Sequence, residues 1–218
     1  MPSFIADDFR FLHTPKTGGV WAYHATAAAG IAPLPGVELL YHADLRQSEA
    51  FADRFTIAFV RHPLDWWRSY WSYRMRTGWV MESHVDAAAA SEDFGEFIGG
   101  VVAHVPGWAS EVFSSFCGAP GRPIQFVGRH ERLVDDLERG LRLAGARFDS
   151  RALRAEPPHN AADETLAAVR YTPALARALA LAEARAIERF YPGKAIPARV
   201  LARRRRLAFP AVRSSFAA

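Results

Sequence analysis

The stretch Phe-Leu-His-Thr-Pro-Lys-Thr-Gly-Gly at 11–19 decides the fold of this chain. Its pattern predicts a buried strand, a glycine-bearing turn that holds Lys16, and a helix that begins near Gly19. Gly18 and Gly19 let the backbone turn tightly and approach a ligand, and the free amides at a helix N-terminus attract anions. With the charge of Lys16 added, the stretch predicts a site for a phosphate or sulfate group.

A second stretch, Phe-Val-Arg-His-Pro-Leu-Asp-Trp-Trp-Arg-Ser-Tyr at 59–70, repeats this logic. A short apolar strand ends at Arg61, and Pro63 is typical of the first turn of a helix, which here carries Ser69. Arg61 and Ser69 are therefore candidates to hold a second phosphate. Two anion sites at two strand ends indicate a ligand with phosphates at both ends of a nucleoside. The mononucleotide P-loop is absent, because the lysine here precedes the glycines.

Together the two stretches resemble the sulfotransferases that use 3′-phosphoadenosine 5′-phosphosulfate (PAPS), especially the carbohydrate branch related to the heparan sulfate sulfotransferases. Residues 15–19 match the family's 5′-phosphosulfate loop, and Arg61 with Ser69 matches its 3′-phosphate site. The likeness extends over residues 8–192, with most of its specificity before Tyr70. It implies the following cofactor-binding residues: Pro15, Lys16, Thr17, Gly18, Gly19, Val20, Arg61 and Ser69. The family usually has Thr or Ser where Val20 stands, which leaves only the backbone amide there.

The segment Tyr-His-Ala-Asp-Leu at 41–45 lies where related carbohydrate sulfotransferases carry a histidine that serves as catalytic base. Histidine suits this role because its ordinary pKa of about 6.5 lets it take a proton at neutral pH. The resemblance makes His42 the candidate general base, with Glu38 or Asp44 as the alternative. His13 is expected to pack against the loop or hydrogen-bond its backbone. Two further histidines are weaker candidates for the base: His62 and His159.

The resemblance is thinner after the second stretch. Residues 127–131 look like the family's later strand-to-helix segment, so Arg129 is a candidate to reach the 3′-phosphate or the adenine. The alternative is a helix-flanking arginine paired with Glu131 or Asp135. Consecutive prolines at 157–158 predict a loop, in which Asn160 is a candidate polar contact.

The implied reaction moves a sulfuryl group from PAPS to a hydroxyl of a carbohydrate or glycolipid and releases adenosine 3′,5′-bisphosphate. His42 would take the acceptor's proton, while Lys16 and the first amides of the helix would stabilise charge on the departing phosphate. No metal is expected, since no acidic metal cluster is visible in the sequence. In the aromatic segment 66–79, core packing is expected for Trp67, Tyr70 and Trp71, and the acceptor pocket is an alternative for the others: Trp66, Tyr73 and Trp79.

The order of strand and helix patterns predicts an α/β fold with a P-loop-like parallel sheet flanked by helices, the fold of the sulfotransferases. In such a sheet, ligands bind outside the carboxyl ends of the strands, where both anion loops fall. Strands are predicted at 9–13, 37–41, 55–60 and 124–127. Helices are predicted at 19–29, 46–52, 63–77, 92–103, 107–117, 130–144, 162–169 and 173–190.

Composition fits one enzyme domain over 1–218, with a basic C-terminal tail at about 195–218: the chain has 218 residues, 50% of them hydrophobic. Neither a signal peptide nor an apolar stretch of about 18 residues is visible, so a cytoplasmic location is expected. The single cysteine, Cys117, is expected in the core. High Ala and Arg usage with few Lys indicates a GC-rich bacterial origin.

A net charge of +4 and a pI of about 9.6 suit an enzyme of polyanionic ligands. Arg203, Arg204, Arg205 and Arg206 form the densest basic run and are candidates for peripheral contact with a membrane surface. Nucleic acid is not expected, since no recognised nucleic-acid-binding pattern accompanies the run. Two other classes stay open: a kinase-like nucleotide-dependent transferase that would require Mg²⁺ and ATP, and a non-enzymatic nucleotide- or nucleic-acid-binding module.

Overall fold

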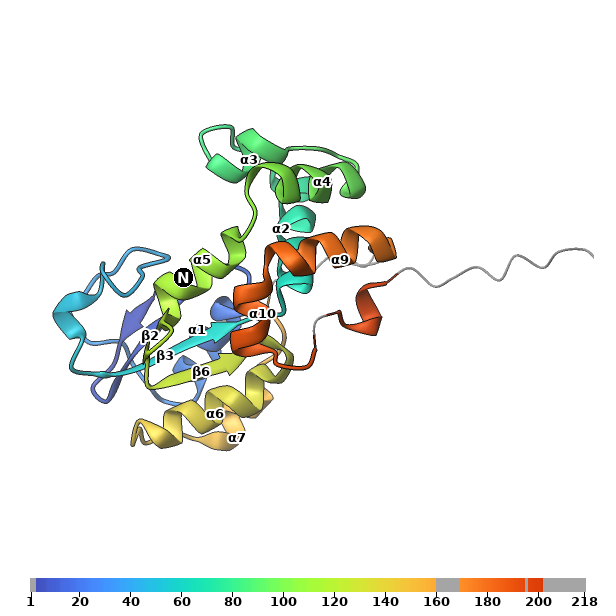
Figure 1. Ribbon diagram of the computed structural model, residues 1–218. Helices are drawn as coiled ribbons and strands as arrows, with labels where there is room; N and C mark the ends of the chain where they lie inside the picture. Colours follow the sequence, from blue (N-terminus) through green and yellow to red (C-terminus); the bar gives the residue numbers. More distant parts are fainter. Residues whose placement is uncertain (1–2, 160–168, 195, 202–218) are drawn as a thin grey trace, which may run out of the picture.

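A four-stranded sheet with the order β1-β2-β3-β6 forms the centre of the computed structural model (Figure 1). The structure describes residues 3–159, 169–194 and 196–201. The strands are β1 Phe4–Ile5, β2 Phe9–Leu12, β3 Phe55–Val60 and β6 Phe126–Arg129. The pairs β2–β3 and β3–β6 are parallel, and β1 adds an antiparallel edge. The predicted α/β class with a mostly parallel sheet is confirmed.

Alternating side chains of β2 and β3 belong to two different hydrophobic cores, as period-two strands buried on both faces require. Phe11 and Phe59 pack into one core, which is covered by α1 Gly19–Ala28, α6 Leu133–Leu143 and α7 Ser150–Ala155. Leu12 and Val60 pack into the other core. Its helices are α2 Pro63–Thr77, α4 Phe94–His104, α5 Trp108–Cys117, α9 Pro173–Ala182 and α10 Ala184–Phe190.

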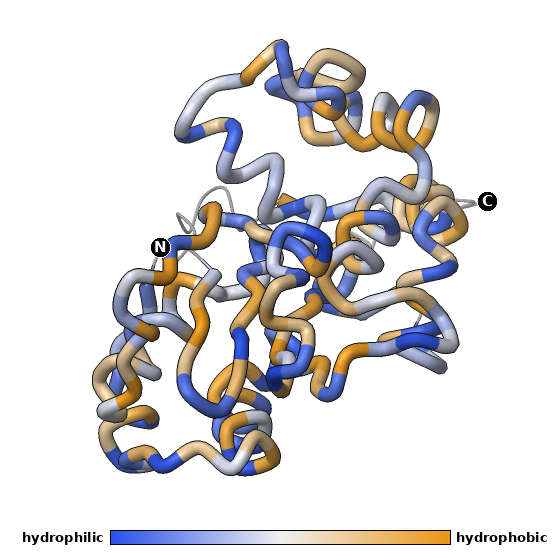
Figure 2. Tube along the Cα trace, turned by 90° about the vertical axis from the view of Figure 1, so that its left-hand side faces the viewer, coloured by the Kyte–Doolittle hydropathy of each residue, from blue (hydrophilic) through white to orange (hydrophobic). Residues whose placement is uncertain are grey.

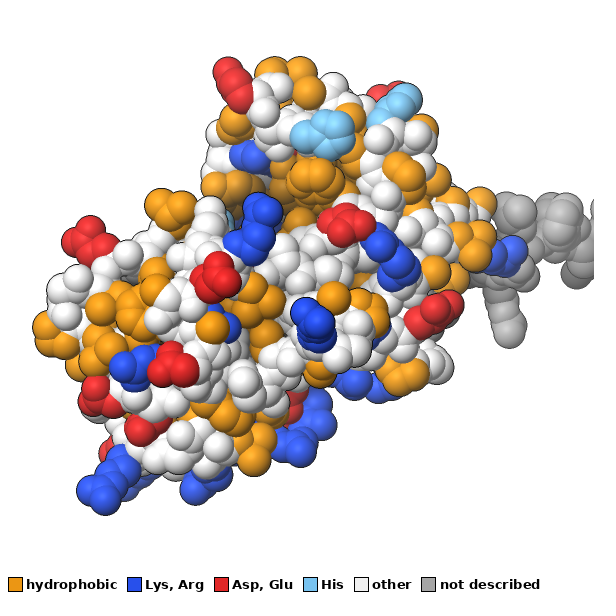
Figure 3. All heavy atoms as spheres, turned by 60° about the vertical axis from the view of Figure 1, so that its left-hand side comes forward, with side chains coloured by type: hydrophobic (Ala, Val, Ile, Leu, Met, Phe, Trp, Pro, Cys, Tyr) orange, Lys and Arg blue, Asp and Glu red, His pale blue; other side chains and the backbone are white. Residues whose placement is uncertain are grey.

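The short helix α3 His84–Ala89 packs with α4, away from the sheet (Figure 1). Along most helices, hydrophobic and hydrophilic residues alternate around the coil, as amphipathic helices require (Figure 2). On one face of the molecule, hydrophobic side chains gather under the helical layer of α3 and α4, and charged side chains are spread over the lower part (Figure 3). Cys117 is fully buried in the second core, as expected.

The predicted helix at 173–190 consists of two helices that meet at Glu183. This carboxylate is fully buried and accepts hydrogen bonds from the Trp67 indole at 3.0 Å and from the amides of Ala109 and Ser110 at 3.0 and 2.9 Å. Glu183 thereby satisfies free amides at the N-terminus of α5. The break between α9 and α10 thus places Glu183 where it can bind the amides of α5, which are distant in the sequence.

Several other predicted elements differ from the structure. Residues 37–41, predicted as a strand, form a loop. The Tyr41 carbonyl accepts a hydrogen bond from the Ser3 amide, but no β-ladder forms around this bond. The predicted helix at 46–52 is only a 3₁₀ turn, Glu49–Phe51, and the helix predicted from 130 starts with another, His130–Arg132. Short elements were not predicted: β1, α3, α7 and the hairpin of β4 Gly118–Ala119 with β5 Arg122–Pro123.

Three predictions concern residues that are not, or only partly, described. The helix at 162–169, Asn160 and the run Arg203–Arg206 lie outside the described residues. Within the predicted tail, Val200 is buried and Arg199 binds Asp65 near the start of α2. In the described part of the chain, every helix is too short or too polar to cross a bilayer.

Candidate functional site

The loop between β2 and α1 has a strained backbone that is held from several sides. Lys16 adopts a left-handed conformation with φ of 62°, which is uncommon for a residue other than glycine, and Gly18 follows with φ of 89°. A Cβ on Gly18 would lie 2.5 Å from Leu133 Cδ2, so a side chain there would force the Leu133 side chain of α6 to shift. Backbone strain of this kind clusters at functional sites.

Neighbouring side chains support this loop. The His13 ring packs so closely on Gly19 that a Cβ there would lie 1.9 Å from His13 Cδ2, in agreement with the packing role expected for this histidine. The Thr17 hydroxyl donates to the carbonyl of Thr14 at 2.8 Å, and the Trp66 indole donates to the carbonyl of Pro15 at 2.8 Å. Thr17 is buried and its hydroxyl is used within the loop, so only its backbone is available to a ligand.

The first turn of α1 leaves amides for a ligand. Among the described residues no side chain caps this helix, and its first turn contains no acidic residue. The amides at the start of the helix, including that of Val20, therefore keep the positive end of the helix dipole uncompensated. Val20 lines the cavity described below.

The parallel register places two polar residues side by side at the carboxyl edge of the sheet. Val60 pairs with Arg129, so Arg61 and His130 leave β3 and β6 together. Arg61 Nη1 donates to the Lys16 carbonyl at 3.4 Å, and its buried Nε has no hydrogen-bond partner among the described residues. Burial and the charge of Arg61 lower the pKa of His130 to about 4, so this ring is neutral at physiological pH.

One face of α2 completes the site. Ser69, Ser72, Tyr73 and Arg76 follow the i, i+3, i+4, i+7 spacing that aligns side chains on a helix. The Ser72 hydroxyl is buried and has no hydrogen-bond partner in the described part of the chain. Arg74, on the same helix, is neutralised by Asp86 at 2.8 Å.

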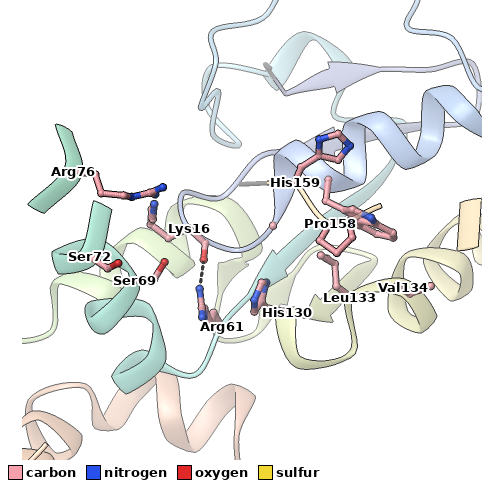
Figure 4. Close-up of a pocket in the computed structure, with 12 residues that line it drawn as sticks. Lys16, Arg61, Ser69, Ser72, Arg76, His130, Leu133, Val134, Pro158 and His159 are labelled. Atoms are coloured by element: carbon pink, nitrogen blue, oxygen red, sulfur yellow. Dashed lines mark hydrogen bonds between the residues drawn. The ribbon is translucent and has the colours of Figure 1, made fainter. Parts of the chain in front are cut away.

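These elements surround a cavity of about 730 Å³, which adjoins a smaller one of about 320 Å³. The two are both lined by Lys16, Gly18, Trp21, Arg61, Ser69, Arg76, His130 and His159. Figure 4 shows the smaller cavity between the polar side chains of α2 on one side and an apolar wall on the other, with Arg61 and His130 between them. The apolar wall contains Leu133, Val134 and Pro158.

The cavity is strongly positive. Lys16, Arg61 and Arg76 line it, and none of the three forms an ion pair with a described carboxylate. Burial, together with three nearby arginines, lowers the pKa of Lys16 to about 8, and burial also lowers the pKa of Arg61. Lys16 Nζ lies 4.0 Å from the centre of the Tyr73 ring, an aromatic contact that supports a cation in place of a carboxylate. Such a set of cations is suited to a ligand with several negative charges.

His42 lines the larger cavity beside this positive region. Its Nδ1 lies 2.8 Å from the carbonyl oxygen of His13, and its ring packs near those of His13 and Tyr41. A carbonyl only accepts hydrogen bonds, so Nδ1 is the donor and Nε2 of the neutral ring holds the free lone pair. Partial burial lowers the pKa of His42, opposed by the His13 carbonyl.

The structure brings most of the predicted site residues to one cavity: Pro15, Lys16, Gly18, Gly19, Val20, His42, Arg61 and Ser69. Thr17 lies behind the loop. Arg129 lines neither cavity, because its guanidinium lies 5.1 Å from the centre of the Tyr191 ring, and it pairs with neither Glu131 nor Asp135 among the described contacts.

Of the alternative bases, His159 lines both cavities, with its Nε2 against the Glu156 carboxylate, and the others are placed less favourably. The Asp44 carboxylate accepts from the amides of a local turn, and neither it nor Glu38 lines the cavity. Both ring nitrogens of His62 are engaged by backbone groups. Of the three aromatic residues weighed for the acceptor pocket, Tyr73 lines the larger cavity, whereas Trp66 and Trp79 pack into the core.

Sequence reasoning missed several lining residues. His130 lies beside Arg61 because Val60 of β3 pairs with Arg129 of β6. The sequence alone does not give this register, so it did not predict that His130 lines the cavity. Ser72 and Arg76 could have been found from Ser69 by helical spacing alone. Trp21 and the apolar wall reach the cavity through packing between α1, α6 and the segment after α7. The sequence carries no local signal for this packing.

Comparison with known proteins adds no relative to this description: no protein-family model, no curated protein and no solved structure matches the chain. The class established by the structure is that of a mixed α/β protein with a mostly parallel central sheet flanked by helices.

Proposed function

We propose that this protein is a PAPS-dependent sulfotransferase that transfers a sulfuryl group to a hydroxyl of a carbohydrate or glycolipid acceptor. The observation that carries the proposal is the convergence of Lys16, Arg61 and Arg76 on one cavity without carboxylate partners among the described residues. Cations that lie close together repel one another, and Lys16 and Arg61 are also partly buried, so such a cluster is best explained by an anionic ligand. The resemblance at 15–19 and 61–69 then selects PAPS among anionic ligands.

In this proposal the two predicted anion sites bind the two phosphate-bearing ends of the nucleotide. Lys16 and the first amides of α1 bind the 5′-phosphosulfate, as helix N-termini commonly bind phosphate. Arg61 and Ser69 bind the 3′-phosphate, since both residues line the cavity and the Arg61 guanidinium can form charge-assisted hydrogen bonds. The apolar wall of Leu133, Val134 and Pro158 provides a surface for the adenine ring.

Sulfuryl transfer then follows from groups on three elements. His42 Nε2 takes the proton of the acceptor hydroxyl, whose oxygen forms a bond to sulfur while the bond from sulfur to the 5′-phosphate oxygen breaks. Negative charge grows on that departing oxygen. Lys16 and the α1 amides stabilise this charge until adenosine 3′,5′-bisphosphate, which carries it, is released. The proton stays on His42 after the transfer and then passes to water.

The acceptor would enter the larger cavity, where Tyr41 and Tyr73 lie beside His42 and Lys16. Tyr41 and Tyr73 are exposed, at 45% and 37%, and although Lys16 Nζ lies over one face of the Tyr73 ring, these residues offer aromatic surface to a sugar ring. A carbohydrate or glycolipid hydroxyl is therefore the acceptor class that this wall favours.

The kinase-like alternative receives less support from the cavity. No Asp or Glu among the described residues lines it, although a Mg²⁺–ATP site usually holds its ion through carboxylates. The proposed fold is that of the sulfotransferases, as the resemblance at 15–19 and 61–69 implies. The proposed catalytic groups, His42 and Lys16, need no ion for the transfer described.

The test is transfer of ³⁵S-labelled sulfuryl from PAPS to a panel of oligosaccharides, glycolipids and simple phenols. Label on a hydroxyl-bearing acceptor, lost in Lys16→Ala, is the expected result. To separate a wrong acceptor from a wrong cofactor, melting is measured with adenosine 3′,5′-bisphosphate in the same series. A ligand at 100 times its Kd stabilises the fold by about 2.7 kcal/mol. No transfer and no melting shift would contradict the proposal.

A further inference from the structure

We propose that His24, Glu156 and His159 form a binding site for one divalent transition-metal ion, with Zn²⁺ the ion that best matches the three ligands. One ligand atom from each residue lies within 4.8 Å of the other two. Two imidazole nitrogens and a carboxylate oxygen are a donor set that zinc and other first-row metal sites use. No residue of this cluster has a role in the proton transfer or charge stabilisation described above.

Contacts of the backbone hold the two parts of the cluster together. His24 lies on α1, one turn after Trp21, whose indole donates to the Glu156 carbonyl at 3.1 Å. At the other end of α7, the Asp149 amide donates to the Ala29 carbonyl at 3.0 Å. The segment that carries Glu156 and His159 is therefore attached to α1 on both sides of α7, independently of any ion.

The side chains are already close to one another. The rings of His24 and His159 are stacked with their centres 4.3 Å apart and an angle of 17° between the planes, and His159 Nε2 contacts the Glu156 carboxylate. All three side chains are partly buried, so part of their rotational freedom is lost before an ion binds, while the site stays open to solvent.

The other close pair of histidines lacks this arrangement. The rings of His13 and His42 have centres 4.6 Å apart, but His42 Nδ1 is engaged by the His13 carbonyl. In the part of the chain that the structure describes, only His24, Glu156 and His159 bring three potential metal ligands within reach of one ion. The carboxylate is the feature that sets this cluster apart.

Three protein ligands leave a coordination position for water or an anion. His159 also lines both cavities, so a bound ion would lie at their edge and fix the position of that part of the wall. The ion is thus placed to stabilise the segment after α7 against α1. No metal is predicted from the sequence, in which no acidic metal cluster is visible; packing of α7 on α1 brings His24 to Glu156 and His159.

The test is titration of the full-length protein with Zn²⁺ in competition with a chelating dye, together with the visible absorption spectrum after addition of Co²⁺. The structure predicts one ion per chain. Replacement of a ligand in His24→Ala, His159→Ala or Glu156→Gln should weaken binding by about 10- to 100-fold or more, since even supporting residues of metal sites have effects of that size. The matched control is His104→Ala, an exposed histidine at the end of α4, which should bind as the unchanged protein does.

Two further measurements keep the result unambiguous. Zn²⁺ should raise the melting temperature of the unchanged protein and of His104→Ala, but not that of His24→Ala, whose melting without the ion reports on its folding. Equal Zn²⁺ binding by unchanged protein and by His24→Ala and His159→Ala would overturn the proposal, as would an absence of stoichiometric binding. Since His24 lines neither cavity, binding of adenosine 3′,5′-bisphosphate to His24→Ala tests the proposed function separately.

Discussion

The Nδ1 atom of His42 lies 2.8 Å from the carbonyl oxygen of His13, the residue that connects β2 to the loop of Lys16. This single contact fixes which nitrogen of His42 carries the proton and leaves Nε2 as the acceptor. It also joins the candidate base to the same strand end that positions the candidate charge-stabilising lysine. Base and lysine are thus held at a defined separation by one short stretch of backbone.

His42→Ala should lower turnover by about 100-fold or more, because a general base contributes about that much to proton transfer. Binding of adenosine 3′,5′-bisphosphate should stay unchanged, since the predicted phosphate contacts are made by other residues. Steady-state kinetics and calorimetry measure the two effects. His104→Ala is the control, and turnover retained in His42→Ala would move the role of base to Glu38, Asp44 or another histidine.

The lowered pKa of Lys16 predicts a pH dependence of nucleotide affinity. Below about pH 8 the lysine is protonated in the free protein, so affinity should be constant there. Above pH 8, Lys16 of the free protein loses its proton, and Lys16 must take up a proton again when the anion binds. Affinity should therefore fall with rising pH until the pKa of Lys16 in the complex is reached. Calorimetric titrations from pH 7 to pH 10 measure this.

Lys16→Arg provides the control for that pH dependence, since a guanidinium stays charged over the whole range. The variant should bind with little change between pH 7 and pH 10, apart from changes of the nucleotide itself. An equal fall in affinity in both proteins would show that a group other than Lys16 titrates.

Arg61→Ala should weaken binding of adenosine 3′,5′-bisphosphate by about 10- to 100-fold, the effect of losing a charge-assisted hydrogen bond worth about 1.5–3 kcal/mol. Affinity for AMP, which lacks the 3′-phosphate, should change much less. The matched control is Arg129→Ala, because Arg129 ends the paired strand but lies against Tyr191. Equal losses for the two nucleotides would contradict a 3′-phosphate role for Arg61.

Gly18→Ala should destabilise the protein and weaken nucleotide binding, because it combines a left-handed backbone with displacement of the Leu133 side chain. Gly30→Ala separates the two causes, since Gly30 has a similar φ of 85° but open space around it. The backbone penalty alone is about 1–2 kcal/mol. Urea denaturation should therefore give a larger loss for Gly18→Ala, and equal losses would remove the packing argument.

Features that could be predicted from the sequence depend on short stretches. The loop of Lys16 and the position of Arg61 follow from an apolar run, a glycine or proline and a charged residue within one strand-turn-helix unit. The order of strands and helices also gave the α/β class. These patterns are local, and tertiary packing reinforces them.

The remaining parts depend on contacts between distant segments. The register of β3 with β6 places His130, and not Arg129, at the cavity. No local sequence pattern predicts that register. The break at Glu183 arises because its carboxylate satisfies amides of α5. The cluster that includes His24 and His159 exists only through packing of α7 on α1.

The central claim is that the cavity binds a nucleotide with a 3′-phosphate. Calorimetric titration of adenosine 3′,5′-bisphosphate, alongside AMP and ADP with Mg²⁺, tests it most directly. The account predicts one bound bisphosphate per chain, with an affinity about tenfold or more above that of AMP, as one charge-assisted hydrogen bond at Arg61 would give. Tighter binding of ADP with Mg²⁺, or no binding of the bisphosphate, would contradict it.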